Sequence, residues 1–135
     1  MIQDEAGLRR LLEETRTIAV VGMSARPDRP SNEVAQYLRR AGYTVIPVNP
    51  AYPEILGERC YPSLREVPVK IDMVDVFRNP ADVMPIVEDA IAVGAKSLWL
   101  QLGVIVPEAV ARAEAAGMAV VMDHCVKIEH RRLLG

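Results

Sequence analysis

The chain lacks several features that would place it in a common class of protein. Its two cysteines, Cys60 and Cys125, are too few for a disulfide framework and lack the spacing of metal ligands. Its formal net charge is only −2, which gives no electrostatic footprint for DNA or RNA. No apolar run approaches the roughly 18 residues that span a bilayer, and the acidic start does not resemble a secretory signal. We therefore expect a cytoplasmic protein with reduced thiols, no metal site, and neither a nucleic acid nor a membrane as partner.

What the chain does have is a regular alternation of two hydrophobic patterns. Short β-branched apolar runs alternate with segments of period 3.6, which is typical of βαβ units around a parallel sheet. Half of the 135 residues are hydrophobic, enough for one continuous core. The pattern predicts a single Rossmann-like α/β domain over residues 1–135, with helices on both faces of a five-stranded parallel sheet of order 3-2-1-4-5.

The hydrophobic runs and the capping residues locate the elements. Strands are expected at residues 17–21, 43–48, 71–77, 97–102 and 118–122. An opening helix is expected with Leu8, Leu11 and Leu12 on one face, and a second from an N-cap at Ser31 to Gly42. A short helix should follow Ser63. Further helices are expected from Asn79-Pro80 to Gly94, at 107–116 and at 126–134. Ligands of such sheets bind at the carboxyl ends of the strands. In the expected order this places a crevice between strands one and four, extended toward strand two.

The loop after the first strand is the first candidate for a binding site. It leads into a helix N-terminus, where free N–H groups and the helix dipole attract anions. Its candidate residues are Gly22, Ser24, Arg26, Arg29, Pro30 and Ser31. With one glycine the loop is not the G-x-G-x-x-G fingerprint, and a tight turn with solvated arginines is the alternative interpretation.

The end of the second strand lacks the acidic residue that dinucleotide-binding sheets place about 20 residues beyond the glycines. The strand ends instead in Val48, Asn49 and Pro50, which are candidate ligand contacts at the same sheet edge. The missing acid argues against a nicotinamide-dependent dehydrogenase.

Two further strand ends carry candidate residues. Phe77 and Arg78 end the third strand, where an aromatic ring and a cation can hold an adenine and a phosphate. The alternative is that Phe77 closes the core and Arg78 pairs with a helix C-terminus. At the end of the fourth strand, Gln101 is polar in an apolar run, and Gly103 permits a close approach to the backbone. The alternative for Gln101 is a buried side chain bonded to a neighbouring loop.

These residues together resemble a known family, the small stand-alone CoA-binding proteins, which are related to the domain that opens the α subunit of succinyl-CoA synthetase. The resemblance runs from about Thr17 to Leu133 and rests on the order of eight blocks: Gly22-x-Ser24, Arg29-Pro30-Ser31, Tyr43-x-Val45-x-Pro47-Val48-Asn49-Pro50, Tyr61-Pro62-Ser63-Leu64, Val76-Phe77-Arg78, Gly94-Ala95-Lys96, Trp99-Leu100-Gln101-x-Gly103 and Asp123-x-Cys125. It implies the Rossmann-like fold and a site for coenzyme A (CoA) or an acyl-CoA at the strand ends. His124 departs from the arginine expected in the last block.

The leading hypothesis is a CoA-binding module without catalysis of its own. The ligases that it resembles need a phosphorylatable histidine and a nucleotide-grasp domain, for which this chain has no room. The alternatives are a small oxidoreductase or acyl transferase, with Cys125 as the candidate nucleophile, and a CoA-binding subunit of a larger acyl-CoA enzyme. We expect His130 on a solvated helix face, and Asp72 and Asp75 as strand-edge charges and not an acid/base pair.

Overall fold

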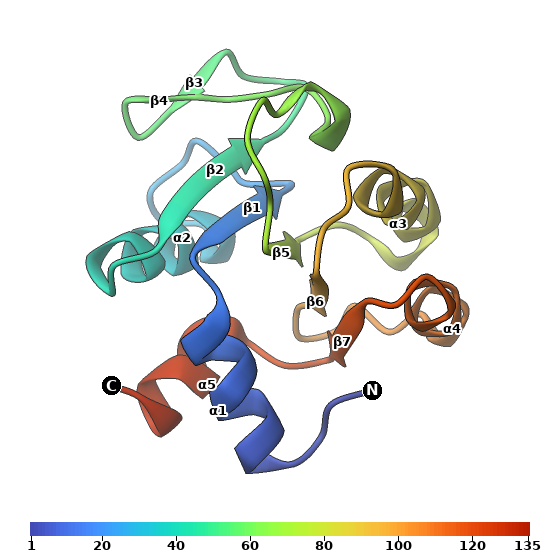
Figure 1. The fold of residues 1–135 in the computed structure, drawn as a ribbon. Coiled ribbons are helices and arrows are strands. Elements are labelled where there is room, and N and C mark those ends of the chain that lie inside the picture. The colour runs from blue at the N-terminus through green and yellow to red at the C-terminus, as the bar shows by residue number, and fades with distance from the viewer.

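The computed structural model describes residues 1–135 and has three layers, a central parallel sheet with helices on either side (Figure 1). Five parallel strands pair in the order β2-β1-β5-β6-β7. Their bounds are β1 Thr17–Val21, β2 Thr44–Val48, β5 Met73–Val76, β6 Ser97–Leu100 and β7 Ala119–Met122. The predicted Rossmann-like α/β class with a five-stranded parallel sheet is therefore confirmed.

Helices cover both faces of this sheet (Figure 1). One hydrophobic layer forms beneath α1 (Glu5–Glu14), α2 (Pro30–Arg40) and α5 (Val126–Leu133). The other lies beneath α3 (Val83–Ala92), α4 (Pro107–Ala115) and the single 3₁₀ turn η1 (Leu64–Glu66). A small hairpin of β3 (Glu54–Ile55) and β4 (Glu58–Arg59) follows β2, and a second 3₁₀ turn, η2 (Pro80–Asp82), precedes α3. No helix combines the length and the apolar character that a membrane crossing needs.

The position of the third long strand corrects the expected order in one respect. We expect it outside strand two, but β5 lies at the centre of the sheet, with Ile18 of β1 paired to Met73. The segment between β2 and β5 has no long helix, and its η1 turn packs against α3 through the layer that contains Leu64 and Val67. The chain thus passes from β2 back over β1 on the face opposite α2, as a right-handed crossover requires.

This order moves the ligand crevice by one strand. The chain leaves β1 toward one edge of the sheet and leaves β5 toward the other, so the two connections diverge at their carboxyl ends. In doubly wound sheets, that divergence marks the ligand site. The crevice therefore opens over β1 and β5, with β2 and β6 beside it, instead of between strands one and four.

Most expected elements form, with adjusted ends. The second to fifth strands are one to three residues shorter than expected, and the opening helix buries Leu8 and Leu12. The N-cap assignment of Ser31 is wrong: α2 starts at Pro30 after Arg29, and the Ser31 Oγ atom instead accepts from the Ser24 N–H at 2.9 Å. Proline at the first helical position is favourable because it has no N–H to satisfy.

Gly22 directly follows β1, and its backbone lies tightly against the end of β5. Its φ is +86°, and a Cβ atom there would lie 2.2 Å from the carbonyl oxygen of Phe77. The absence of a side chain therefore lets the first loop pass directly against the end of β5. Gly117 has nearly the same φ, +88°, but no atom lies within 4 Å of the corresponding Cβ position.

These two glycines give a matched test of that close approach. We expect Gly117→Ala to lower the free energy of unfolding by about 1 kcal/mol, the cost of the left-handed conformation alone. Gly22→Ala adds a backbone clash and should cost at least about 2 kcal/mol more. Denaturant unfolding of both variants measures the difference, and equal losses would contradict the proposed contact.

Candidate functional site

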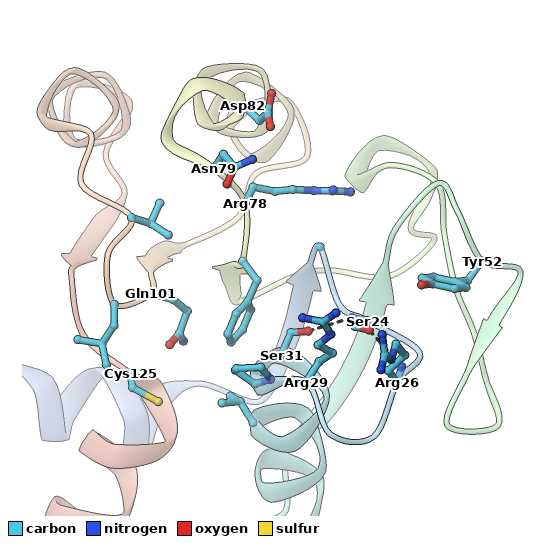
Figure 2. A pocket seen from close by; sticks show the side chains of 16 residues that line it. Ser24, Arg26, Arg29, Ser31, Tyr52, Arg78, Asn79, Asp82, Gln101 and Cys125 are labelled. Atoms are coloured by element: carbon cyan, nitrogen blue, oxygen red, sulfur yellow. Dashed lines mark hydrogen bonds between the residues drawn. The ribbon is translucent and has the colours of Figure 1, made fainter.

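A cleft of about 780 Å³ lies over the carboxyl ends of β1, β5 and β6 (Figure 2). It lies where the diverging connections predict a ligand. The cleft brings together most of the candidate residues from three separate loops. These are Gly22, Ser24, Arg26, Arg29, Pro30, Ser31, Phe77, Arg78 and Gln101.

The loop between β1 and α2 is held in place by its own side chains. The Ser24 Oγ atom accepts from the Arg26 N–H at 3.1 Å, and the Ser24 carbonyl accepts from the Asn32 Nδ2 atom at 2.8 Å. Gln36 donates in turn to the Asn32 Oδ1 atom at 2.6 Å, and Asn32 is fully buried. Ser24 and Ser31 thus brace the loop, and the N-terminal end of α2 faces the cleft.

The cleft is rich in cations that lack anionic partners. Arg29 is exposed and Arg78 half-buried, and neither forms an ion pair. Arg26 has only the distant carboxylate of Asp28, at 3.7 Å, and both side chains are solvated. Together with the α2 N-terminus, these guanidinium groups form a site suited to phosphate oxygens.

A second hollow of about 470 Å³ adjoins the first. Arg78 and Asp82 line both, so the two spaces meet at these side chains. Val48 and Pro50, the candidates from the end of β2, line this second hollow and not the main cleft. Most of its other walls are apolar, among them Pro62, Leu64, Ala81, Pro85 and Ile86, and Ser63 and Asp89 add polar groups.

Two candidate residues line neither space. Asn49 is buried: its Nδ2 atom donates to the Met23 carbonyl at 3.0 Å, and its Oδ1 atom accepts from the Ala51 N–H at 2.9 Å. It ties the end of β2 to the loop after β1. Gly103 turns the chain with a φ of +81°, and its N–H donates to the Asp123 Oδ1 atom at 2.8 Å. Both residues shape the surroundings of the cleft.

Several lining residues escaped the sequence argument. Tyr52 comes from the segment before the β3–β4 hairpin, and the others are Val34, Asn79, Asp82, Leu102 and Val104. Asn79 and Asp82 follow Arg78 so closely that position at the same sheet edge could have indicated them. Tyr52 had no such signal, because its place depends on how the hairpin segment folds.

Asp75 lies in the centre of the sheet and not at a strand edge, which corrects the expectation for it. It is fully buried, and its Oδ1 atom accepts from the Gln101 Nε2 atom at 2.6 Å. Its Oδ2 atom has no hydrogen-bond partner. Burial raises the pKa of Asp75 to about 7, and the bond from Gln101 lowers it only in part. Gln101 thereby connects the cleft to a carboxyl group in the core. The alternative interpretation of Gln101 as a buried, hydrogen-bonded side chain is therefore correct in part, but its partner is Asp75 and not a neighbouring loop.

Asp72, by contrast, lies at the amino edge of the sheet. Its Oδ2 atom accepts from the backbone N–H groups of Arg16 at 3.0 Å and Thr17 at 2.9 Å. Partial burial raises its pKa, but these two hydrogen bonds and the nearby Lys96 outweigh that effect, and the pKa is lowered below its ordinary value. The two aspartates therefore lie at different depths and do not form an acid/base pair.

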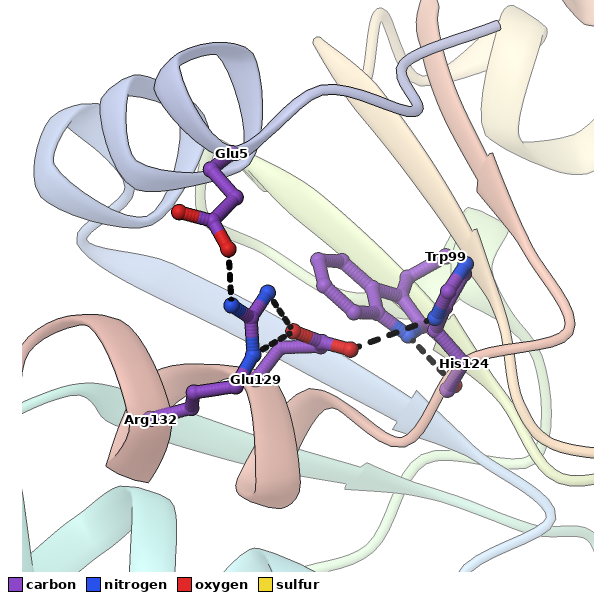
Figure 3. Close-up of polar contacts among 5 residues, drawn as sticks. All are labelled: Glu5, Trp99, His124, Glu129 and Arg132. Carbon is purple, nitrogen blue, oxygen red and sulfur yellow. Dashed lines mark hydrogen bonds and ion pairs between the residues drawn. The ribbon is translucent and has the colours of Figure 1, made fainter.

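The turn between β7 and α5 carries Cys125 into the cleft and His124 away from it. Cys125 lines the cleft, whereas the His124 Nδ1 atom lies 3.2 Å from the Glu129 Oε1 atom (Figure 3). The Trp99 Nε1 atom donates to the His124 carbonyl at 2.8 Å, and Arg132 joins Glu129 to Glu5 of α1. His124, the departure from the resembled pattern, thus belongs to a network that fixes this turn and is not among the lining residues.

The expectation of a solvated His130 is wrong. Its ring is buried between α5 and α2, and its Nδ1 atom forms a hydrogen bond of 2.8 Å with the Tyr37 hydroxyl. Burial lowers the pKa of His130 below its ordinary value. The Tyr43 ring packs against the same imidazole in a T-shaped arrangement, with the ring centroids 5.6 Å apart. This histidine joins α5 to α2 at a point that does not line the cleft.

Comparison with known protein families matches residues 16–131 of the chain to the CoA binding domain family. The chain belongs to this family. A relative of nearly equal length is an uncharacterised protein, YneT, of Bacillus subtilis, which is 38% identical over 93% of each chain. A hypothetical protein from Pyrococcus horikoshii has a solved structure with a TM-score of 0.96 and 44% identity, covering 98% of this chain and 94% of its own.

The family also occurs within larger enzymes. An ADP-forming acetate–CoA ligase of Archaeoglobus fulgidus is 31% identical over 82% of this chain, which corresponds to 18% of the ligase. The chain thus spans only a small part of that enzyme. What the two proteins share is the CoA binding domain and its fold.

The depth difference between Asp75 and Asp72 predicts opposite pH dependences of stability. Between about pH 4 and pH 7, an unfolded chain holds Asp75 ionised while the folded chain holds it protonated, so the stability falls as the pH rises. In Asp75→Asn this loss is absent. We expect the advantage of the variant over the wild type to grow between pH 4 and pH 7, by on the order of 4 kcal/mol, and to stay constant above.

Asp72→Asn serves as the control of opposite sign. The lowered pKa of Asp72 contributes stability that is present above the unfolded value and is lost as the pH falls, so its removal should matter least in acid. Chemical denaturation at several pH values measures both differences. A difference between Asp75→Asn and wild type that does not change with pH would contradict the assigned burial.

Proposed function

We propose that the protein binds CoA or an acyl-CoA in the cleft over β1 and β5. The observation that carries this proposal is the convergence of Arg29, Arg78 and the N-terminal end of α2 on one cleft, with no carboxylate paired to either arginine. Membership of the CoA binding domain family supports it. CoA carries a pyrophosphate and a further ribose phosphate, so it supplies negative charges that can pair with these guanidinium groups.

The shape of the two adjoining spaces suits the parts of CoA. The arginines and the α2 N-terminus would hold the phosphates, and the apolar walls of the smaller hollow, including Pro50 and Ile86, would hold the adenine. The pantetheine arm would then extend along Phe77 and Val104 toward Gln101. The volumes of about 780 and 470 Å³ leave room for all three parts.

We further propose a cytoplasmic, single-domain binding module without catalysis of its own. Two observations support this reading of the cleft. The Cys125 thiol has no hydrogen-bonded base beside it, as nucleophilic catalysis requires. Both histidines are engaged elsewhere, His124 with Glu129 and His130 with Tyr37.

Ligand preference is the most direct test. Isothermal titration calorimetry should show binding of CoA and much weaker binding of NAD, because the end of β2 carries no acid to hold a ribose hydroxyl pair. Acetyl-CoA in a parallel titration shows whether an acyl group is accepted. NAD binding as tight as CoA binding would refute the proposal.

The phosphate contacts are tested by charge removal. Arg29→Ala and Arg78→Ala should each weaken CoA binding roughly tenfold at low salt, since a hydrogen bond to a charged group contributes about 1.5 kcal/mol or more. The loss should shrink as salt rises, because salt screens the interaction. Arg10→Ala is the control, since Arg10 is exposed on α1 and pairs with Glu14 of the same helix. Unchanged affinity in both cleft variants would remove the phosphate assignment.

A further inference from the structure

Asp75 is an unusual residue because it is a fully buried carboxylic acid in the centre of the sheet. Its neighbours in the strand register are Val20 of β1 and Trp99 of β6, both within the hydrophobic layer under α1, α2 and α5. The carboxyl group has no cation beside it, and only one of its oxygen atoms is hydrogen-bonded. Burying such a group costs stability that an apolar side chain would not cost. Packing therefore does not account for this residue.

Its one hydrogen bond fixes the orientation of Gln101. In the structure the Gln101 Nε2 atom donates to Asp75, and whenever the carboxyl group is ionised it can only accept, which holds the amide in this orientation. The side chain of Gln101 is 4% exposed and lines the cleft, and its Oε1 atom has no partner in the protein. Since the N–H side of the amide is held in the core, the oxygen is the polar atom left for a ligand.

The surroundings of Gln101 differ from the arginine side of the cleft. Figure 2 shows Gln101 and Cys125 on one side, and Arg26 and Tyr52 on the other. The lining near Gln101 is apolar or weakly polar: Phe77, Leu102, Val104 and Cys125. An acceptor oxygen in such a setting disfavours an anion and favours a neutral ligand group with an N–H, O–H or S–H donor.

We propose that Asp75 is a positioning residue that holds the Gln101 amide so that its Oε1 atom accepts a hydrogen bond from the pantetheine arm of the bound ligand. This inference rests on the CoA binding proposed above and specifies how the uncharged arm is recognised. The arm offers a hydroxyl O–H, two amide N–H groups and the terminal S–H group as donors. Asp75 itself does not touch the ligand and acts only through Gln101.

The ionisation of Asp75 gives the arrangement a pH dependence. The pKa of about 7 means that the carboxylate gains a proton near neutrality, and the resulting O–H can donate to the Gln101 Oε1 atom. The amide would then rotate and present its N–H₂ group to the cleft, so the donors of the arm would lose the acceptor that the Oε1 atom provides. The other titratable or charged groups of the cleft are Arg26, Arg29, Arg78, Tyr52, Asp82 and Cys125.

A double-mutant cycle with two ligands tests the inference. Calorimetry would compare CoA with adenosine 3′,5′-bisphosphate, which keeps nucleotide phosphates but has no arm, on wild type, Asp75→Val, Gln101→Met and the double variant. Each single variant should weaken CoA binding roughly three- to tenfold and leave the bisphosphate within about twofold, since one hydrogen bond to the arm is lost. The double variant should be no weaker than Gln101→Met, because Asp75 acts through Gln101. Asp72→Val is the matched control at the amino edge of the same segment, and it should leave both affinities unchanged.

The conservative variant Asp75→Asn keeps an acceptor for Gln101 but cannot ionise, and it covers the case in which Asp75→Val does not fold. Wild type should lose CoA affinity relative to the bisphosphate as the pH falls from 8 to 6, whereas Asp75→Asn should bind CoA with a pH-independent ratio. The bisphosphate comparison removes the contribution of the phosphates and of the charged cleft residues. CoA without its sulfur atom distinguishes a hydroxyl or amide donor, which it retains, from the thiol.

The outcomes separate this inference from the proposed function. Wild type that binds neither CoA nor the bisphosphate would overturn the proposed function and the inference with it. Wild type that binds CoA, with variants that lose CoA and the bisphosphate equally, or that lose neither, would overturn the inference alone. Additive losses in the double variant would also overturn it, because they would show that Asp75 and Gln101 act separately.

Discussion

The pairing of β1 with β5 is the constraint on which the rest of the site depends. Because β5 returns to the centre of the sheet, the connection after β1 runs to one edge and the connection after β5 runs to the other. The two strand ends are thereby left uncovered. Gly22 permits them to approach so closely that a single Cβ atom would collide with the Phe77 carbonyl. The arginine-bearing loop and Arg78 then face the same cleft, although no ion pair or side-chain hydrogen bond joins them.

The two faces of the sheet differ in the polar groups that they bury. The layer beneath α3 and α4 is built almost entirely of aliphatic side chains. On the other face, the layer beneath α1, α2 and α5 borders the cleft, and buried polar groups enter it there: Ser31, Asn32, Asp75 and Gln101. Hydrogen bonds satisfy most of them, but the free oxygen of Asp75 shows that satisfaction is incomplete at the floor of the cleft. The apolar face can compensate for this loss.

The sequence predicted the strands, the helices and most of the lining residues because these follow from local rules. A β-branched run such as Thr17–Val21 has one favourable state in a parallel sheet, and residues at strand ends share one edge. The place of β5 did not follow, because the segment after β2 lacks a helix whose pattern would show which face it crosses. Asp75 was assigned to an edge because charged residues are seldom fully buried, and nothing in its neighbourhood along the chain marked it as an exception. Tyr52 and Asn49 depended on how separate loops meet.

The polarity of the cleft follows from where each group is fixed. Arg26 and Arg29 belong to an exposed loop that is braced by Ser24 and Ser31, so they can adjust to an anion without disturbing the core. Gln101 is held from below by a group inside the sheet and has little freedom. A cleft with adaptable cations on one side and a fixed amide on the other would distinguish the two ends of the proposed ligand. In the proposed complex, charge would govern the encounter with the anionic end of the ligand, and hydrogen-bond geometry would govern the fit of the neutral end.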